Sequence, residues 1–133
     1  RPILCVGETL EQRSIGLASD TVSGQLRHCL HGLHNVDTLV IAYEPVWAIG
    51  TGQAATPEIA ADVMGGAILD TLKGLYPSAA GQVPLLYGGS VNPGNAAAYA
   101  AESCIHGSLV GGAALRGDQF LEIARITAEA KTV

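Results

Sequence analysis

Four short apolar runs recur along the chain, and each is followed by a stretch with helical character. The runs are Ile3–Val6, Leu39–Tyr43, Val83–Tyr87 and Leu109–Val110. Continuous apolar strands separated by helices are typical of a parallel sheet, because parallel neighbours need a long crossover connection. The order therefore predicts an α/β fold of four βα units, which fits either half of an eight-unit barrel or a small open sheet.

The intervening segments carry helical periodicity and recognisable helix starts. We expect one helix from Leu10 to about Leu33 with a break near Gly16, and a second from Pro57 to about Leu75. A short helix is expected near Asn95 to Ala101, and Asp118 can cap the last helix. In α/β architectures of this kind, functional groups gather where the strands end.

Size and charge limit the classes of function. The chain has 133 residues, enough for one domain spanning residues 1–133, and a formal net charge of −5. The negative charge argues against a nucleic-acid or anionic-membrane surface as partner. No run approaches the roughly 20 apolar residues that a bilayer span needs.

The cysteines and the first residue bear on the setting of the chain. Three cysteines, an odd number without a CxxC pair, favour a reduced, cytoplasmic setting. The chain begins at Arg1 rather than Met and reaches its first strand at once, which suggests that it is cut on its N-terminal side. A processed protein would look the same.

One carboxylate, Glu44, follows the second strand and borders an unusually apolar loop. Surface loops are mostly polar, but this loop carries Trp47 and Ile49 before a Gly-Thr-Gly turn. The loop either packs on its own scaffold or is a lid that excludes water beside Glu44. A carboxylate dried by a lid can act as a general base, whereas a Glu at such a position can equally be an ordinary surface residue.

Three glycine-containing turns lie at the same predicted edge of the sheet. They are Gly88-Gly89-Ser90, Gly111-Gly112 and Gly50-Thr51-Gly52. Backbone N–H groups at such turns can bind phosphate, although glycine also serves simply to permit a tight turn. Three turns on one edge favour phosphate, and we expect Glu44 to face the corner that they form. A P-loop and a GxGxxG motif are both missing, so a nucleotide is not indicated.

A histidine-rich run, HCLHGLH from His28 to His34, raises the alternative of a metal site. Spacings of three on a helix do not bring its four candidate ligands to one point, and Gly32 loosens the segment. Solvated histidines are the simpler interpretation, and His106 is interpreted as structural. No metal ligand is assigned.

Taken together, these motifs resemble those of the triosephosphate isomerase family. The similarity covers nearly the whole chain and keeps the order and approximate spacing of the family's motifs. The segments that carry it are CVGETLEQR (Cys5–Arg13), AYEPVWAIGTG (Ala42–Gly52), TPE (Thr56–Glu58), YGGSVNPGN (Tyr87–Asn95) and LVGGAAL (Leu109–Leu115).

The resemblance implies a (β/α)8 barrel of which this chain is the C-terminal half, strands five to eight. It implies interconversion of dihydroxyacetone phosphate and glyceraldehyde 3-phosphate through an enediolate, a step of glycolysis and gluconeogenesis, without a cofactor or metal. By family match, Glu44 moves the proton between the two carbons. The groups that hold the substrate phosphate are the backbone N–H groups of Gly50, Ser90, Gly111 and Gly112.

The resemblance also assigns roles in the lid. Trp47 is implied to be a hinge residue whose partner in the open lid is Glu8. Two contacts are implied to hold the closed lid, namely Tyr87 with the backbone of Ala55 and Ser90 with the backbone of Gly52.

The resemblance leaves some features of the family unmatched. The family's asparagine, lysine and histidine belong to the first four strands, so we expect this chain alone to be inactive or nearly so, and to self-associate or be unstable. The parent protein is implied to be a homodimer. The alternatives are a non-catalytic phosphate-binding half barrel and, less well supported, another phosphate-binding barrel enzyme.

Four positions depart from the family pattern. The usual arginine on the sixth helix and its aspartate partner correspond to Ile68 and Cys104, so we expect a small apolar contact in place of an ion pair. His106 stands where aspartate is usual and Ala114 where serine is frequent. These departures are expected to affect stability more than chemistry.

Overall fold

A single four-stranded parallel sheet organises the chain. The computed structural model describes residues 1–132, and its strands lie in the order in which they occur in the sequence. They are β1 (Ile3–Val6), β2 (Val40–Tyr43), β3 (Leu85–Tyr87) and β4 (Gly107–Ser108). β1 and β4 are therefore the two edges of the sheet, as the half-barrel interpretation expects.

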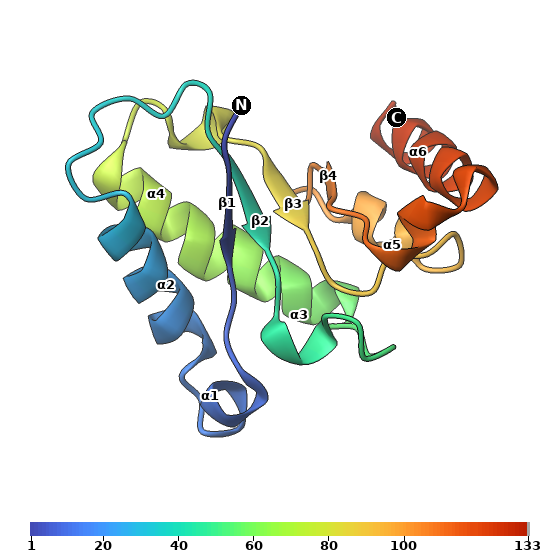
Figure 1. Cartoon of the computed structure of the whole chain (residues 1–133). Coiled ribbons are helices and arrows are strands. Elements are labelled where there is room, and N and C mark those ends of the chain that lie inside the picture. The colour runs from blue at the N-terminus through green and yellow to red at the C-terminus, as the bar shows by residue number, and fades with distance from the viewer. Residues whose placement is uncertain (133) are drawn as a thin grey trace.

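Six α-helices accompany the strands within residues 1–132. They are α1 (Leu10–Ser14), α2 (Ala18–Cys29), α3 (Pro57–Asp62), α4 (Leu69–Leu75), α5 (Ala96–Ala101) and α6 (Gly117–Lys131). Figure 1 shows α2, α3 and α4 behind the sheet, whereas α6 stands apart from the strands beside α5. The predicted break near Gly16 is confirmed, because that glycine, at φ 79°, lies between α1 and α2.

The core lies between the sheet and the helices behind it. Alternate strand residues face this layer, including Ile41, Tyr43 and Leu85, which are at most 1% exposed. Helices α2 and α4 fill the other side with Leu26 and Leu72. Between α3 and α4 the helix continues through a π-helical segment, residues 63–68, so the predicted continuous helix from residue 57 to 75 is confirmed with a local change of winding.

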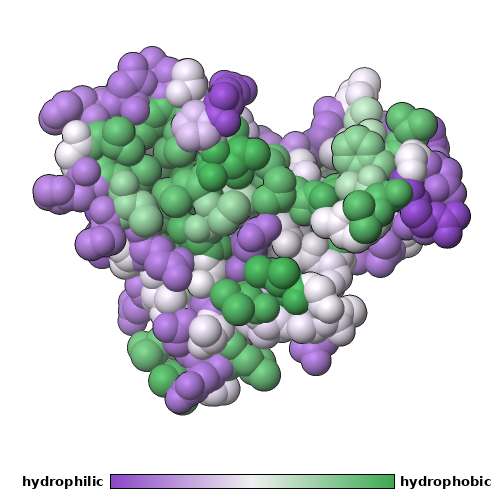
Figure 2. All heavy atoms as spheres, in the orientation of Figure 1, coloured by the Kyte–Doolittle hydropathy of each residue, from purple (hydrophilic) through white to green (hydrophobic). Residues whose placement is uncertain are grey.

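The opposite face of the sheet is not covered by a helix of the described residues (Figure 1). Figure 2 shows hydrophobic side chains gathered over the strands on this face, with a second group on α6 and a notch between them. A continuous apolar run such as residues 3–6 predicts a buried strand, but this prediction is wrong for β1, since Ile3 is 46% exposed and Cys5 is also exposed. β1 is an edge strand, and no helix or strand within residues 1–132 packs against its outward-facing side chains.

Two predicted boundaries near the C-terminus are also wrong. The fourth strand is Gly107–Ser108 rather than Leu109–Val110, although the Leu109 N–H still donates to the Tyr87 carbonyl at 2.9 Å. Asp118 does not cap α6. It lies in the first turn of that helix and forms an exposed ion pair with Arg116 at 3.3 Å. A groove of about 380 Å³ separates β4 from α6.

Candidate active site

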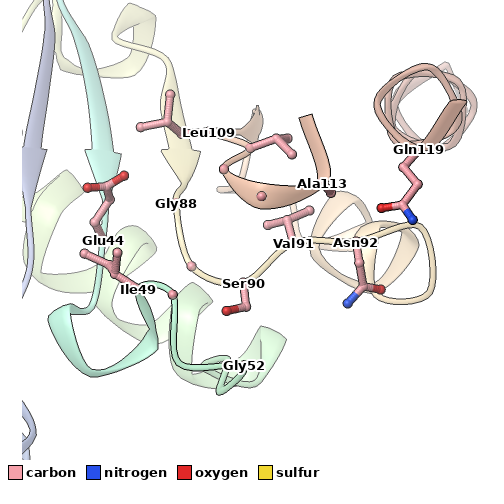
Figure 3. A pocket seen from close by; sticks show the side chains of 15 residues that line it. Glu44, Ile49, Gly52, Gly88, Ser90, Val91, Asn92, Leu109, Ala113 and Gln119 are labelled. Carbon is pink, nitrogen blue, oxygen red and sulfur yellow. The ribbon is translucent and has the colours of Figure 1, made fainter. Parts of the chain in front are cut away.

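A cavity of about 470 Å³ lies at the C-terminal ends of β2, β3 and β4 (Figure 3). The three glycine-containing turns that the sequence singled out all contribute to its wall, because parallel strands bring their carboxyl ends to one edge. The residues that line it are Glu44, Ile49, Gly50, Gly52, Gly88, Gly89, Ser90, Val91, Asn92, Leu109, Val110, Gly111, Gly112, Ala113 and Gln119.

Glu44 enters this cavity wall directly after β2. Its backbone N–H donates to the Val6 carbonyl at 2.7 Å, which extends the pairing with β1 by one residue. The side chain lies across Gly88 of the neighbouring strand end, where an added Cβ would come within 2.5 Å of the Glu44 Cγ. Glycine at position 88 is therefore what lets the half-buried carboxylate lie flat against the sheet.

The direction of the Glu44 carboxylate differs from the expectation. In Figure 3 it points along the strands and away from Ser90, so it lines the cavity without facing the glycine corner. Cys5 on β1 lies beside it. Partial desolvation, and then the neighbouring Glu44 carboxylate, raise the pKa of the Cys5 thiol. The raised pKa favours the protonated, uncharged thiol beside the carboxylate.

The groups expected to hold phosphate lie on the other side of the cavity. Gly50, Gly111 and Gly112 are exposed, and a Cβ built at any of them would meet no atom within 4 Å. Gly50 has φ 65°, a left-handed conformation that favours glycine. These backbones are thus open to a ligand from the cavity side, as anion recognition by N–H groups requires.

The apolar loop after Glu44 has a defined shape. Residues 46–48 form one 3₁₀ turn, and the Thr51 hydroxyl donates to the Trp47 carbonyl at 2.9 Å. Gly52, with φ 76°, turns the chain toward α3, whose N-terminus is capped by the Thr56 side chain. Ile49 is 49% exposed at the cavity mouth, so an apolar side chain lies at the point where a lid would cover a ligand.

The base of this loop is held by Glu8. The Trp47 indole N–H donates to the Glu8 carboxylate at 3.0 Å, which is the contact expected for an open lid. Glu8 is fully buried and also accepts the hydroxyl of Tyr43 at 3.0 Å. Burial, and then the neighbouring Glu8 carboxylate, raise the pKa of Tyr43, so its hydroxyl remains a donor.

The two contacts expected for a closed lid have different outcomes. The Ala55 N–H donates to the Tyr87 hydroxyl at 2.9 Å, so this contact is already present while Trp47 is bound to Glu8. Ser90, in contrast, donates to the Ala48 carbonyl at 2.9 Å, so the expected contact with Gly52 is not the one its hydroxyl makes. With Trp47 bound to Glu8, the Ser90 hydroxyl therefore contacts the base of the loop and not its tip.

Two polar side chains of the cavity lining were not anticipated from the sequence. Asn92 and Gln119 extend side chains on the outer side of the cavity (Figure 3). The Asn92 side-chain oxygen accepts the Gly94 N–H at 2.8 Å and thereby shapes the turn after β3. The sequence held a usable signal for Asn92, which comes soon after the strand-end motif Gly88-Gly89-Ser90, but none for Gln119, which lies in α6.

The histidines and Cys104 lie away from the cavity. His28 is on α2, and among residues 1–132 no group of three His, Cys, Asp or Glu side chains could hold a metal ion. The His106 Nδ1 accepts the Leu85 N–H at 2.9 Å, so this ring has a structural contact. The Cys104 thiol donates to the Ala61 carbonyl at 3.7 Å and faces Gly65, while Ile68 is fully buried in the core.

Comparison with known proteins places this geometry in a family. The sequence model described as triosephosphate isomerase matches residues 1–127. The chain belongs to the triosephosphate isomerase family. Its four parallel strands with alternating helices are the half of an α/β barrel that this membership leads one to expect.

Individual triosephosphate isomerases support the same assignment. The proteins of that name from Chromohalobacter salexigens and Caldanaerobacter subterraneus are 52% and 49% identical to the chain, and each match covers 92% of the chain and 50% of the relative. The triosephosphate isomerase of Xanthobacter autotrophicus is 48% identical over 95% of the chain and 49% of its own length. The chain thus spans about half the length of the curated relatives it matches.

Proposed function

We propose that this chain is the C-terminal half, strands five to eight, of a triosephosphate isomerase. The parent protein would interconvert dihydroxyacetone phosphate and glyceraldehyde 3-phosphate by proton transfer through an enediolate. The observation that carries the proposal is the single cavity that joins Glu44 to three exposed glycine turns at the C-terminal edge of a parallel sheet. Family membership supports it independently.

In this proposal Glu44 is the catalytic base. Its position at the cavity wall, half-buried between Cys5 and Gly88, suits a carboxylate that must be partly desolvated to accept a proton from carbon. The carboxylate would rotate from its place beside Cys5 into the cavity when substrate binds. The phosphate would be held by the backbone N–H groups of Gly50, Ser90, Gly111 and Gly112.

The loop after Glu44 would act as the lid. An enediol phosphate that is exposed to water loses its phosphate readily, so the lid must exclude water while the intermediate exists. Trp47 would be the hinge residue and Glu8 its partner in the open state. Tyr87 would hold the far end of the loop at Ala55, and Gly52 would supply the turn at its tip.

One observation favours a second candidate, a phosphate-binding half barrel without turnover. The cavity lining of the described chain contains no lysine and no histidine, so no cationic or imidazole group polarises a substrate carbonyl. Loss of one such electrostatic contact costs about 3–4 kcal/mol, or roughly 10²–10³ in rate. We therefore expect the 133-residue chain alone to bind triose phosphate weakly and to be inactive or nearly so.

The remaining proposals concern the cofactor, oligomeric state and location of the parent enzyme. We propose that it needs no cofactor or metal, forms a homodimer and works in the cytoplasm in glycolysis and gluconeogenesis. The net charge of −5 gives nucleic acid or an anionic membrane little electrostatic attraction. Among residues 1–132, no helix combines the length and apolar character of a membrane span.

A fusion protein tests the proposal. The half of the Chromohalobacter salexigens relative that this chain does not match is joined upstream of Arg1, and isomerase turnover is measured by a coupled assay beside the 133-residue chain. We expect turnover from the fusion protein and little or none from the chain. A folded fusion protein that binds triose phosphate without turnover would support the phosphate-binding alternative. Ordinary turnover by the chain alone would contradict its expected inactivity.

A further inference from the structure

A fully buried carboxylate lies under the hinge of the loop, and three side chains donate to it. Glu8 accepts the Trp47 indole, the Tyr43 hydroxyl and one guanidinium N–H of Arg13, each at 3.0 Å from Oε1. Arg13 is the cationic member of this group, and its side chain is 26% exposed while that of Glu8 is 0% exposed. A buried charge needs such a partner, because removing it leaves the other charge uncompensated.

Arg13 contacts the hinge as well as the carboxylate. Its Cζ lies 5.5 Å from the centroid of the Trp47 ring, within the range of a cation–π interaction. The guanidinium therefore covers the indole while it binds the same oxygen that the indole N–H binds. Arg13 and Glu8 together hold the ring in place, one at its face and the other at its N–H.

The local sequence fixes Arg13 at this point. α1 is short, but a capping box closes its N-terminus, since the Thr9 hydroxyl accepts the Gln12 N–H and the Gln12 side chain accepts the Thr9 N–H. The Arg13 N–H donates to the Thr9 carbonyl at 3.0 Å. The arginine side chain consequently leaves a defined turn directly beside Glu8.

We propose that Arg13 is a positioning residue for the lid, holding the Trp47 indole docked on Glu8 in the open conformation and keeping Glu8 compensated when the indole leaves. The link to catalysis rests on the proposed function, whereas the docking itself does not. As Trp47 moves away, Glu8 loses one donor but keeps Arg13 and Tyr43. The hinge can therefore open and close without leaving a buried carboxylate unpaired.

Trp47 is the only tryptophan among the 133 residues, so its fluorescence reports on the hinge alone. Quenching by acrylamide is compared for the wild-type chain, Arg13→Met and Arg13→Lys, with Arg27→Met on the exposed side of α2 as the control. Loss of the cation–π contact should raise the undocked population of the indole about two- to fivefold. We expect faster quenching in Arg13→Met, an intermediate value in Arg13→Lys and no change in Arg27→Met.

Arg13→Met leaves the buried Glu8 carboxylate without its cationic partner, which can itself affect folding. A second pair of variants avoids this effect. Glu8→Gln keeps an acceptor for the indole, and Glu8→Gln with Arg13→Met removes both charges. Folding of each variant is checked by circular dichroism. We expect the double variant to be quenched faster than Glu8→Gln alone. Equal quenching in this pair, or in wild type and a folded Arg13→Met, would overturn the proposal.

The fusion protein separates this inference from the proposed function. There, Arg13→Met should change kcat and KM in different proportions, because a lid equilibrium acts on both binding and closure. Arg27→Met should change neither. Absence of any turnover in the wild-type fusion protein would count against the isomerase assignment and leave the fluorescence result standing. Turnover that Arg13→Met leaves unaltered would overturn the role of Arg13 in the lid.

Discussion

Glu44 shows how narrowly the position of one carboxylate is set by its neighbours. Gly88 leaves the space that its side chain occupies, since a Cβ there would lie 2.5 Å from the Glu44 Cγ, and the uncharged Cys5 thiol is a neighbour of the carboxylate. The sequence predicts the residue and its edge of the sheet. It does not predict the side-chain direction, which depends on a contact between β1 and β2.

The role of Glu44 can be tested in the fusion protein. Glu44→Gln keeps the size of the side chain and removes the base, so we expect kcat to fall by about 10²–10⁴-fold. The matched control is Glu58→Gln, in the exposed first turn of α3, which should retain activity. Coupled-assay kinetics measure both. Equal activity of Glu44→Gln and wild type would exclude this carboxylate as the base.

His106 gives a prediction about acid stability. Partial burial, and then the positive charge of Lys131, lower the pKa of His106 below its usual value of about 6.5. The unfolded chain therefore binds more protons, so the free energy of unfolding falls as the pH drops through about 6.5 toward the lowered pKa. His106→Asn can still accept the Leu85 N–H and should lose less stability on acidification.

Urea unfolding at several values between about pH 7 and pH 5 measures this difference. His34→Asn, on an exposed loop, is the control and should follow the wild-type curve. A His106→Asn curve parallel to that of wild type would show that this ring does not contribute.

Several site residues illustrate what a sequence can and cannot predict at this scale. Strand-end glycines and Glu44 were predictable because the strand pattern alone places them on one edge. The partner of Ser90 was not, since it depends on whether the loop base or the loop tip lies closer. The role of Arg13 was not predictable either, because its contact with Trp47 joins α1 to a turn that is far away in the sequence.

Among the elements, the strands and helices next to the core were the most predictable. β2 and the helix from residue 57 to 75 carry strong apolar patterns and lie where expected. β4 was displaced by two residues, because Leu109 and Val110 are as apolar as a strand but belong to the cavity wall. An apolar run in a sequence can belong to a strand or to the wall of a ligand cavity, and the sequence pattern does not distinguish the two.

The π-helical segment offers a matched pair of glycine substitutions. A Cβ at Gly66 would meet no atom within 4 Å, whereas a Cβ at Gly65 would lie 3.2 Å from the Cys104 Sγ and 3.3 Å from its Cβ. Gly66→Ala should therefore raise the free energy of unfolding by up to about 1 kcal/mol. Gly65→Ala should gain less or destabilise, since Cys104 must shift.

Urea unfolding of the 133-residue chain measures the two variants side by side. Both variants replace a glycine of the same segment, so the test is whether the free energy of unfolding is higher for Gly66→Ala than for Gly65→Ala. Equal stabilisation by both would mean that Cys104 does not press on the helix at Gly65.

At the scale of the whole molecule, the sheet has two edges and one apolar face that nothing in residues 1–132 pairs with or covers (Figures 1 and 2). Such edges are templates for pairing with another chain. The number of βα units accounts for the two edges, whereas the continuous apolar strand pattern did not predict an uncovered face. The sequence also did not predict the groove between β4 and α6. Its width depends on how α6 packs against α5, which is a tertiary contact.

We expect the 133-residue chain to self-associate through these edges. Ile3→Lys places a charge on the exposed edge strand β1 and should reduce association, whereas Leu121→Lys, at an exposed position on α6, should not. Sedimentation velocity at several concentrations measures the effect. A chain that remains monomeric throughout, or that responds equally to both substitutions, would contradict association through β1.

The spatial order of the strands repeats their order in the sequence, and this has a consequence for synthesis. Ile3 pairs with Val40, Ile41 with Leu85 and Leu86 with Gly107, so every ladder joins consecutive segments. Each strand can therefore add to the growing edge as the ribosome releases it, and none has to wait for a distant part of the chain. In the proposed complete barrel, only the final seam between first and last strands would have to form after translation.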